Sequence, residues 1–220
     1  MGTIVALGGG ELRDAETRTI DKRIMELTSK SHPNALFIPT ASGDATDYAA
    51  IFNAQYGDAL GCTTDTLYLL KNRPIPDVIT QKIREADLIY VGGGNTLRMM
   101  KLWRKLGIDQ LRVEAHERGT VLSGISAGAI CWFASGFSDS RRFAGKDDWP
   151  YIRVRGLGLV NAIYCPHVDS EKRLAPFTQF MQKHNQFGIG CDDPSATTLP
   201  ESVAVPGGSC GLGCGGPPAP

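Results

Sequence analysis

The stretch VLSGISAGAICWF, from Val121 to Phe133, places an apolar run directly before Gly124-Ile125-Ser126-Ala127-Gly128. A buried strand, a sharp glycine-bounded turn and a helix, in that order, form the setting of a G-x-S-x-G nucleophile elbow. The glycines would let the backbone turn tightly and present Ser126 beside the first N–H groups of the helix. The same residues also fit a simple turn in which the serine is only an N-cap. The motif alone leaves both interpretations open.

Apolar runs alternate with segments of helical periodicity along the chain up to this elbow. The predicted strands cover residues 3–10, 34–40, 64–70, 87–95 and 120–124. The predicted helices cover residues 16–30, 47–61, 76–86, 96–107 and 108–119, and a further helix starts at Ala127. This alternation is typical of β-α-β units, so the sequence predicts an α/β fold with a parallel sheet sandwiched by helices. Ligands of such sheets bind beyond the carboxyl ends of the strands, where GGGN and GISAG fall.

The pattern changes after Phe133. Residues 134–159 read mainly as loop with short extended pieces, and two more strands are expected at 160–167 and 186–193. From Pro206 onward the chain is almost entirely glycine and proline and has few side chains to bury, which predicts disorder. We therefore expect one domain over residues 1–205 and a tail over 206–220.

Composition excludes several classes of protein. The 220 residues include 23 Lys and Arg against 23 Asp and Glu, and a formal net charge of zero argues against binding of nucleic acid or a membrane surface through bulk charge. No apolar run approaches the roughly 20 residues that span a bilayer. The start MGTIVALGGG lacks the features of a signal peptide, and the six cysteines show no C-x-x-C spacing that would indicate zinc. These features favour a reduced, cytoplasmic protein without a metal.

The glycine run GGGELR after the first predicted strand could suggest a nucleotide-binding loop. It fails the G-x-G-x-x-G pattern because Arg13 occupies the third glycine position, and no acidic residue closes the second strand. A Walker motif is also missing from the sequence. We therefore expect no nucleotide cofactor.

A serine nucleophile needs a base, and the chain has four histidines. His32, His116 and His184 lie in a loop, a charged helix and after a polar helix, whereas His167 ends an apolar strand at the expected ligand edge. His167 is thus the favoured general base, although a structural histidine would fit the same place. A carboxylate must orient the imidazole. From the residues alone the candidates are Asp139, Asp147, Asp148, Asp169, Asp192 and Asp193.

The stretch YVGGGNT, residues 90–96, offers backbone N–H groups at the end of the fourth predicted strand. Three glycines let the backbone approach a substrate closely, as an oxyanion-hole donor must. A strand-to-helix turn capped by Asn95 would have the same sequence.

Three motifs in order, YVGGGNTLRMMKLW, GISAGA and CPH, resemble the peptidase E family of serine dipeptidases, which is related to cyanophycinase. The resemblance covers residues 3 to about 198. It implies a flavodoxin-like fold of the class I glutamine amidotransferase type, with Ser126 where those amidotransferases have cysteine. It also implies peptide hydrolysis through an acyl-enzyme, without metal or cofactor. Peptidase E removes an N-terminal aspartate from dipeptides.

The resemblance also implies roles for individual residues. Ser126 matches the nucleophile and His167 the base, and the segment GFSDS, residues 136–140, suggests Asp139 as the acid. The implied oxyanion donors are the backbone N–H groups of Gly93 or Gly94 and of Ala127. The residues expected to bind substrate are Asn95 and Arg173, with Arg141 and Arg142 as further candidates to read a substrate aspartate. A solvated Arg173 is the alternative, because charged runs such as DSEKR are often merely exposed. The loop VDSEKRLAPF is also compressed relative to the family.

The sequence thus predicts a cytoplasmic serine peptidase that acts on short, acidic peptides, binds neither nucleic acid nor membrane, and is a monomer or homodimer. The alternatives are a non-catalytic amidotransferase-like binding domain and a cyanophycinase-like hydrolase or an esterase.

Overall fold

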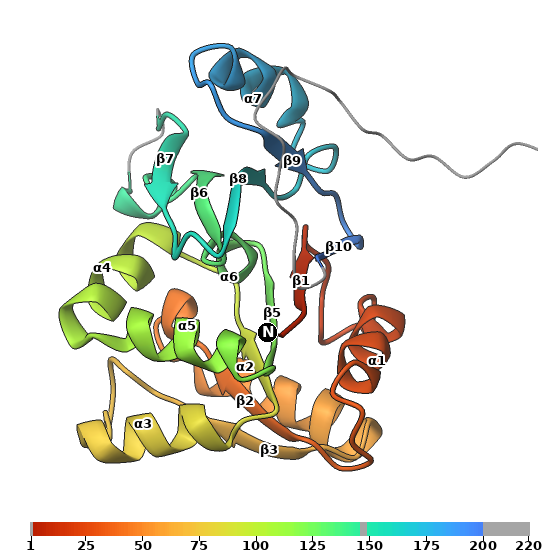
Figure 1. The fold of residues 1–220 in the computed structure, drawn as a ribbon. Helices are drawn as coiled ribbons and strands as arrows, with labels where there is room; N and C mark the ends of the chain where they lie inside the picture. The colour runs from red at the N-terminus through yellow and green to blue at the C-terminus, as the bar shows by residue number, and fades with distance from the viewer. Residues whose placement is uncertain (1, 146–148, 200–220) are drawn as a thin grey trace, which may run out of the picture.

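The strands predicted around the elbow form one sheet. The structure is a computed structural model that describes residues 2–145 and 149–199 of the chain (Figure 1). The predicted disordered tail, residues 206–220, lies outside the described residues. The sheet has the order β10-β1-β5-β4-β2-β3, built from β1 (Ile4–Leu7), β2 (Asn34–Ile38), β3 (Thr63–Thr66), β4 (Leu88–Val91), β5 (Val121–Ile125) and β10 (Ala196–Leu199).

All neighbouring strands of this sheet run parallel except β10, which pairs antiparallel with β1 along Ile4↔Leu199 to Leu7↔Ala196. The strand β10 was not predicted, and it covers the edge of β1. Strands β1, β4 and β5 are buried along their whole length, as expected for strands with helices on both faces.

Helices cover both faces of the sheet, so the predicted sandwich is confirmed. One face, which carries Leu7 and Phe37, packs against α1 (Arg18–Glu26), α2 (Thr46–Phe52) and the π-helix η2 (Asn53–Ala59). The other face, which carries Ala6 and Ile38, packs against α3 (Pro76–Glu85), α4 (Thr96–Leu106) and α5 (Ile108–Glu117). The single helix predicted over 47–61 is therefore an α-helix that continues with π geometry. A 3₁₀ turn, η1 (Thr40–Ser42), follows β2.

A second sheet follows the elbow, and two of its strands fall in the segment 134–159, which was predicted as mainly loop with short extended pieces. Its order is β7-β6-β8-β9, with β6 (Phe133–Ser138), β7 (Ile152–Arg155), β8 (Val160–Cys165) and β9 (Gly188–Gly190). The FASGFS sequence of β6 contains small and polar residues that read as loop, yet Ser135 and Ser138 are buried. Helix α6 (Ala127–Ile130) is short, η3 (Arg142–Ala144) follows β6, and α7 (Leu174–Met181) packs on this sheet through Phe177.

The two sheets are joined near the expected site. The Tyr164 hydroxyl on β8 donates a hydrogen bond of 3.1 Å to the Ala6 carbonyl on β1, and both residues are fully buried. This contact keeps the end of β8 beside the end of β1. It thereby brings the residues that follow the two strands together at one edge of the molecule.

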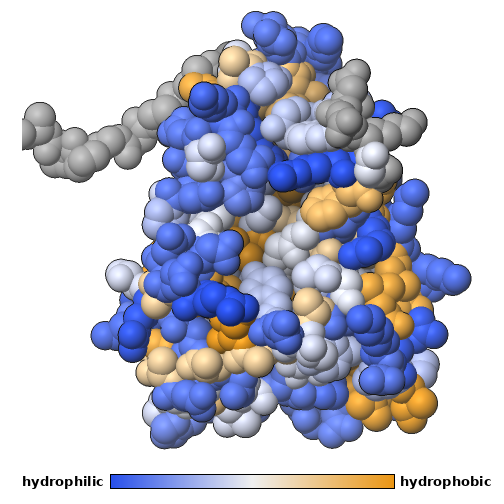
Figure 2. Space-filling view, turned by 180° about the vertical axis from the view of Figure 1, so that it is seen from behind, coloured by the Kyte–Doolittle hydropathy of each residue, from blue (hydrophilic) through white to orange (hydrophobic). Residues whose placement is uncertain are grey.

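Polar residues cover most of the face shown in Figure 2, while hydrophobic residues gather toward one lower edge. In the described part of the chain, no helix combines the length and apolar character needed to cross a bilayer. Four cysteines are buried free thiols, namely Cys62, Cys131, Cys165 and Cys191. Cys210 and Cys214 lie outside the described residues, and the cytoplasmic location stays a prediction.

Candidate active site

Ser126 occupies a strained turn between β5 and α6. Its backbone has φ 53° and ψ −111°, a left-handed conformation that non-glycine residues rarely adopt. A Cβ on Gly128 would lie 2.0 Å from the Val91 carbonyl oxygen, and one on Gly124 would lie 2.4 Å from the Gly128 carbonyl oxygen. The spacing of the motif therefore follows from the close packing of α6 against the strands. The turn is held further by the Ser126 N–H, which donates to the Leu7 carbonyl at 3.1 Å.

The Ser126 hydroxyl lies against the predicted base. His167 follows β8, and its Nε2 is 2.9 Å from Ser126 Oγ, the distance of a normal hydrogen bond. The backbone of His167 is also left-handed, with φ 55°. The imidazole side chain is 18% exposed, so one edge of this pair stays open to a ligand.

The carboxylate partner of His167 is Asp193. Both oxygens of its carboxylate are 2.9 Å from His167 Nδ1, and the Ser170 hydroxyl donates to Oδ2 at 2.9 Å. The prediction that Asp139 orients the imidazole is wrong, because Asp139 Oδ2 instead lies 3.4 Å from Arg173 Nη2. Asp193 was one of the alternatives left open by the sequence.

Sheet pairing explains why Asp193 reaches the histidine. Strands β8 and β9 are parallel neighbours with Cys165 opposite Gly190. Their carboxyl ends therefore lie at the same edge of the sheet. His167 follows the end of β8 by two residues, and Asp193 follows the end of β9 by three. A parallel pairing of the last two predicted strands would have favoured Asp192 or Asp193 over Asp139, but the sequence alone does not reveal that pairing.

The neighbouring Asp192 fastens the loop that follows His167. Its Oδ1 accepts the N–H groups of Asp169 at 3.1 Å and Ser170 at 3.0 Å. Desolvation raises the pKa of Asp192, but hydrogen bonds from backbone N–H groups outweigh it and leave the pKa below its usual value. The charged carboxylate thus holds the loop that carries Ser170, the second partner of Asp193.

Gly9 is a site residue that sequence reasoning missed. A Cβ at Gly9 would lie 1.8 Å from Asp193 Oδ1 and 2.4 Å from His167 Cε1. The glycine run after β1, considered above as a nucleotide loop, therefore packs directly against the His167–Asp193 pair. Its place at the carboxyl end of a strand was visible in the sequence, whereas the neighbour that required a glycine was not.

The structure separates the two glycines proposed as oxyanion donors. The position of a Cβ on Gly93 is 3.7 Å from Ser126 Cβ, so Gly93 lies beside the serine. Gly94 has φ +133° and packs against the backbone of Ala41, where a Cβ on this glycine would lie 2.4 Å from the Ala41 carbonyl oxygen. Ala127 is the first residue of α6, where a backbone N–H has no intrahelical acceptor.

Asn95 serves the fold. Its Oδ1 accepts the Arg98 N–H at 2.9 Å and caps α4, and its Nδ2 donates to the Ser140 carbonyl at 3.2 Å. The amide expected to bind substrate is therefore engaged on both sides. The structure supports the N-cap alternative considered for this residue.

Arg173 is buried and already paired, so the prediction that it reads a substrate carboxylate is wrong. It is 1% exposed, its Nε donates to Glu171 Oε2 at 3.0 Å, and Nη2 lies near Asp139. The guanidinium also lies 5.2 Å from the ring of Tyr151. Two carboxylates already meet this cation, which ties the end of β6 to the loop after His167. The other candidates, Arg141 and Arg142, are exposed around η3.

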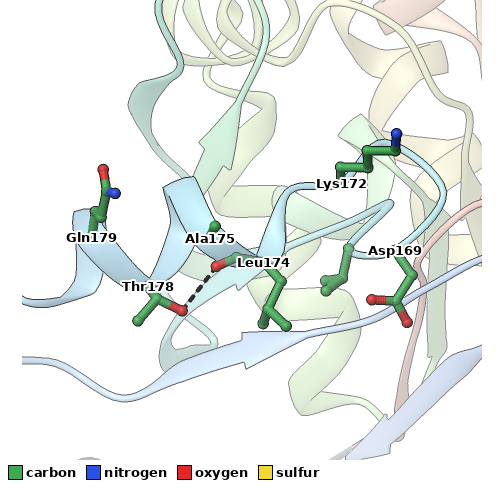
Figure 3. Close-up of a pocket in the computed structure, with 7 residues that line it drawn as sticks. Asp169, Lys172, Leu174, Ala175, Thr178 and Gln179 are labelled. Atoms are coloured by element: carbon green, nitrogen blue, oxygen red, sulfur yellow. Dashed lines mark hydrogen bonds between the residues drawn. The ribbon is translucent and has the colours of Figure 1, made fainter.

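A surface hollow adjoins the loop after His167 (Figure 3). It has a volume of 590 Å³ and is lined by Val168, Asp169, Lys172, Leu174, Ala175, Thr178 and Gln179. In Figure 3 these side chains come from the loop and from one face of α7. Neither Ser126 nor His167 lines it, so it is separate from the serine–histidine pair.

Comparison with known proteins matches the chain to one family. Peptidase family S51 matches residues 4–204. The chain is 37% identical over 201 residues to the uncharacterized peptidase YgaJ of Bacillus subtilis (strain 168), covering 89% of this chain and 82% of that relative. It is 35% identical over 151 residues to the uncharacterized peptidase Lmo0363 of Listeria monocytogenes, covering 67% and 69%.

Two solved structures share the fold. A peptidase from an acI-B1 Actinobacterium has a TM-score of 0.70 at 21% identity, over 90% of this chain and 83% of that one. A putative peptidase E protein from Listeria monocytogenes EGD-e has a TM-score of 0.66 at 20% identity, over 92% and 100%. The predicted class I glutamine amidotransferase-like fold is thereby confirmed.

Proposed function

We propose that this chain, which belongs to peptidase family S51, is a serine-type peptidase that hydrolyses short peptides through an acyl-enzyme on Ser126. The observation that carries the proposal is the continuous hydrogen-bonded series from Ser126 Oγ through the His167 ring to Asp193, with both links at 2.9 Å. A hydroxyl, an imidazole and a carboxylate in this order are the elements of a Ser-His-Asp triad.

The first half-reaction forms the acyl-enzyme. His167 Nε2 takes the proton of Ser126 Oγ as the oxygen attacks the scissile carbonyl carbon, and Asp193 stabilises the imidazolium through Nδ1–H. Negative charge develops on the carbonyl oxygen, where the N–H groups of Gly93 and Ala127 are the proposed donors. The tetrahedral intermediate then collapses, the C–N bond breaks, and the imidazolium gives its proton to the leaving amine.

The second half-reaction uses water. His167 accepts a proton from a water molecule whose oxygen attacks the acyl carbon, and the proton then passes to Ser126 Oγ as the ester bond breaks. The net result is one peptide bond and one water converted into a carboxylic acid and an amine. His167 is the proton acceptor in both half-reactions, first from Ser126 and then from water, and it passes the proton on to the leaving amine and to Ser126 Oγ.

The geometry disfavours a non-catalytic binding domain. A serine kept only as an N-cap has no need of a strained backbone at φ 53°, a histidine at hydrogen-bonding distance and a carboxylate behind that histidine. A cyanophycinase-like hydrolase or an esterase would use the same groups. Substrate profiling separates these from a dipeptidase.

Labelling by a serine-directed fluorophosphonate tests the proposal. We expect stoichiometric labelling of the wild-type chain at Ser126 and none of Ser126→Ala. The matched control is Ser123→Ala, three residues earlier on β5, whose hydroxyl is fully buried and has no hydrogen-bond partner among the described residues. Its labelling should equal that of the wild type. An unlabelled wild-type protein, or a labelled Ser126→Ala, contradicts the assignment of the nucleophile.

The preference for an N-terminal aspartate is also part of the proposal, supported by the resemblance to peptidase E. With Arg173 buried, the cation proposed to meet the aspartate is Arg98. Its side chain is exposed, its Nη2 donates to the Ala41 carbonyl at 3.2 Å, and the Ala41 backbone packs against Gly94. A guanidinium in this place could bind a carboxylate through two hydrogen bonds.

The specificity experiment compares kcat/KM for Asp-Leu and Ala-Leu in the wild type, Arg98→Ala and Arg142→Ala. We expect Arg98→Ala to lower hydrolysis of Asp-Leu about tenfold or more, the scale of one hydrogen bond to a charged group, with little change for Ala-Leu. A selective loss in Arg142→Ala would move the role to η3. A wild type without preference for Asp-Leu ends the specificity claim.

A further inference from the structure

We propose that the hydroxyl of Tyr48 is an additional hydrogen-bond donor of the oxyanion hole beside Ser126, an inference that rests on the serine-peptidase function proposed above. Tyr48 lies on α2, nearly eighty residues before the elbow in the sequence, and none of the motifs discussed above includes it.

The position of Tyr48 is fixed by its ring. A Cβ on Gly92 would lie 2.8 Å from Tyr48 Cε1, so the ring packs directly on the glycine loop that follows β4. The ring also meets Phe37 edge to face, with centroids 5.0 Å apart and an interplanar angle of 72°. These apolar contacts do not involve the hydroxyl, and they aim it along the loop toward Gly93.

The hydroxyl touches the backbone group expected to hold the oxyanion. The Gly93 N–H donates to the Tyr48 hydroxyl oxygen at 3.5 Å, and Gly93 is the glycine that lies beside Ser126. This distance exceeds the usual 2.7–3.2 Å of an N–H···O bond, so the N–H can take a closer acceptor at little cost. In the described part of the chain, the proton of the Tyr48 hydroxyl has no acceptor of its own. A donor with an uncommitted proton therefore lies next to the place where charge would develop.

The phenol keeps this proton at ordinary pH. Burial raises the pKa of Tyr48 above its usual value, the contact with Gly93 lowers it less, and the negative charge of Glu11 raises it further. The neutral hydroxyl accepts from the Gly93 N–H before the reaction, and once Ser126 attacks, the hydroxyl and the N–H would both donate to the substrate oxygen. The proton stays on the phenol throughout, so the contact stabilises charge without a transfer step.

Two other tyrosines of the same aromatic cluster show what distinguishes Tyr48. The Tyr56 hydroxyl donates to Asp21 Oδ1 at 2.9 Å and is committed to the fold. The Tyr90 hydroxyl is buried and has no hydrogen-bond partner within residues 2–145 and 149–199. Both rings pack with Phe52, at centroid distances of 4.4 Å for Tyr56 and 5.6 Å for Tyr90. Tyr90 is consequently a matched control, since replacing it with Phe removes an equivalent hydroxyl from the same cluster.

The experiment compares Tyr48→Phe with Tyr90→Phe in the full chain. It measures the second-order rate at which a fluorophosphonate labels Ser126, and kcat and KM for the best dipeptide. Phosphonylation develops charge on a phosphoryl oxygen in the same hole, so it reports on the donor independently of peptide preference. For Tyr48→Phe we expect the labelling rate and kcat to fall about 10²-fold, the scale of one lost oxyanion donor, with KM within about twofold of wild type.

Tyr90→Phe should retain wild-type rates, and both variants should keep the melting temperature within a few degrees. Labelling of Tyr48→Phe at or above the wild-type rate overturns the role of Tyr48 while leaving Ser126 as the nucleophile. A rise in KM with kcat unchanged also overturns it, because it shows a contact made equally in ground and transition states. A wild type that fails to label overturns the proposed function, and this inference with it.

Discussion

Replacing Asp193 by Asn tests the most consequential contact of the site. The substitution keeps the size of the side chain and its place beside Gly9, but it removes the charge that faces His167 Nδ1 at 2.9 Å. It also allows the amide to donate where the carboxylate only accepted, which favours the wrong tautomer of the imidazole.

The magnitude follows from the geometry. With charge centres about 4 Å apart and an effective dielectric constant near 20, an imidazolium–carboxylate pair is worth about 4 kcal/mol. A dielectric constant near 20, and not the value of about 4 that applies to a dry protein interior, is appropriate because the Asp193 side chain is 26% exposed. A loss of about 4 kcal/mol from the transition state corresponds to about 10³-fold in rate, and the tautomer effect brings the expectation toward 10⁴-fold.

The assay is kcat/KM on the best dipeptide, with Asp139→Asn as the matched control. Asp139 faces Arg173, so its replacement should leave the rate within about tenfold of wild type and lower the stability instead. The reasoning is refuted if Asp193→Asn retains more than about a tenth of the activity, or if Asp139→Asn loses as much activity as Asp193→Asn.

Three further predictions follow from the contacts around the site. Gly9→Ala would place a methyl group 1.8 Å from Asp193 Oδ1 and displace that carboxylate by roughly an ångström, so kcat should fall at least about tenfold. Circular dichroism should show a native fold, and an unchanged kcat contradicts the packing of this loop. Arg173→Met leaves Asp139 and Glu171 without their buried cation, so urea unfolding should show that the free energy of unfolding falls by about 3 kcal/mol. Any loss of activity should be equal for Asp-Leu and Ala-Leu, and a loss confined to Asp-Leu would restore a role in substrate selection. Because the pKa of Asp192 is lowered by folding, its carboxylate stabilises the fold at pH values above the usual carboxyl pKa, and this stability is lost as the pH falls through the folded-state pKa. Between pH 6 and about 3 the free energy of unfolding should therefore fall more in the wild type than in Asp192→Asn, and parallel pH profiles would show that this carboxylate does not hold the loop.

Local features of the sequence were enough to predict the central sheet and the proposed nucleophile. The elbow is encoded within five consecutive residues, because its glycines and its serine answer requirements of one turn. The alternation of apolar runs with helical periodicity likewise predicted all five parallel strands, β1 to β5, and the helices between them. His167 was identifiable since it ends an apolar strand.

The carboxylate, the glycine behind it and the role of Arg173 depended on tertiary structure. The choice of Asp193 among six aspartates requires the parallel pairing of β8 with β9. The requirement for Gly9 arises from β10 pairing with β1, which places the segment that carries Asp193 beside the glycine run. Strand β6 escaped prediction because small and polar residues, including Ser135, Gly136 and Ser138, break up the apolar pattern of its two buried phenylalanines. Sequence patterns record which side chains are buried within one element. They do not record which elements become neighbours, and contacts between residues far apart in the chain are decided by how the sheets pack.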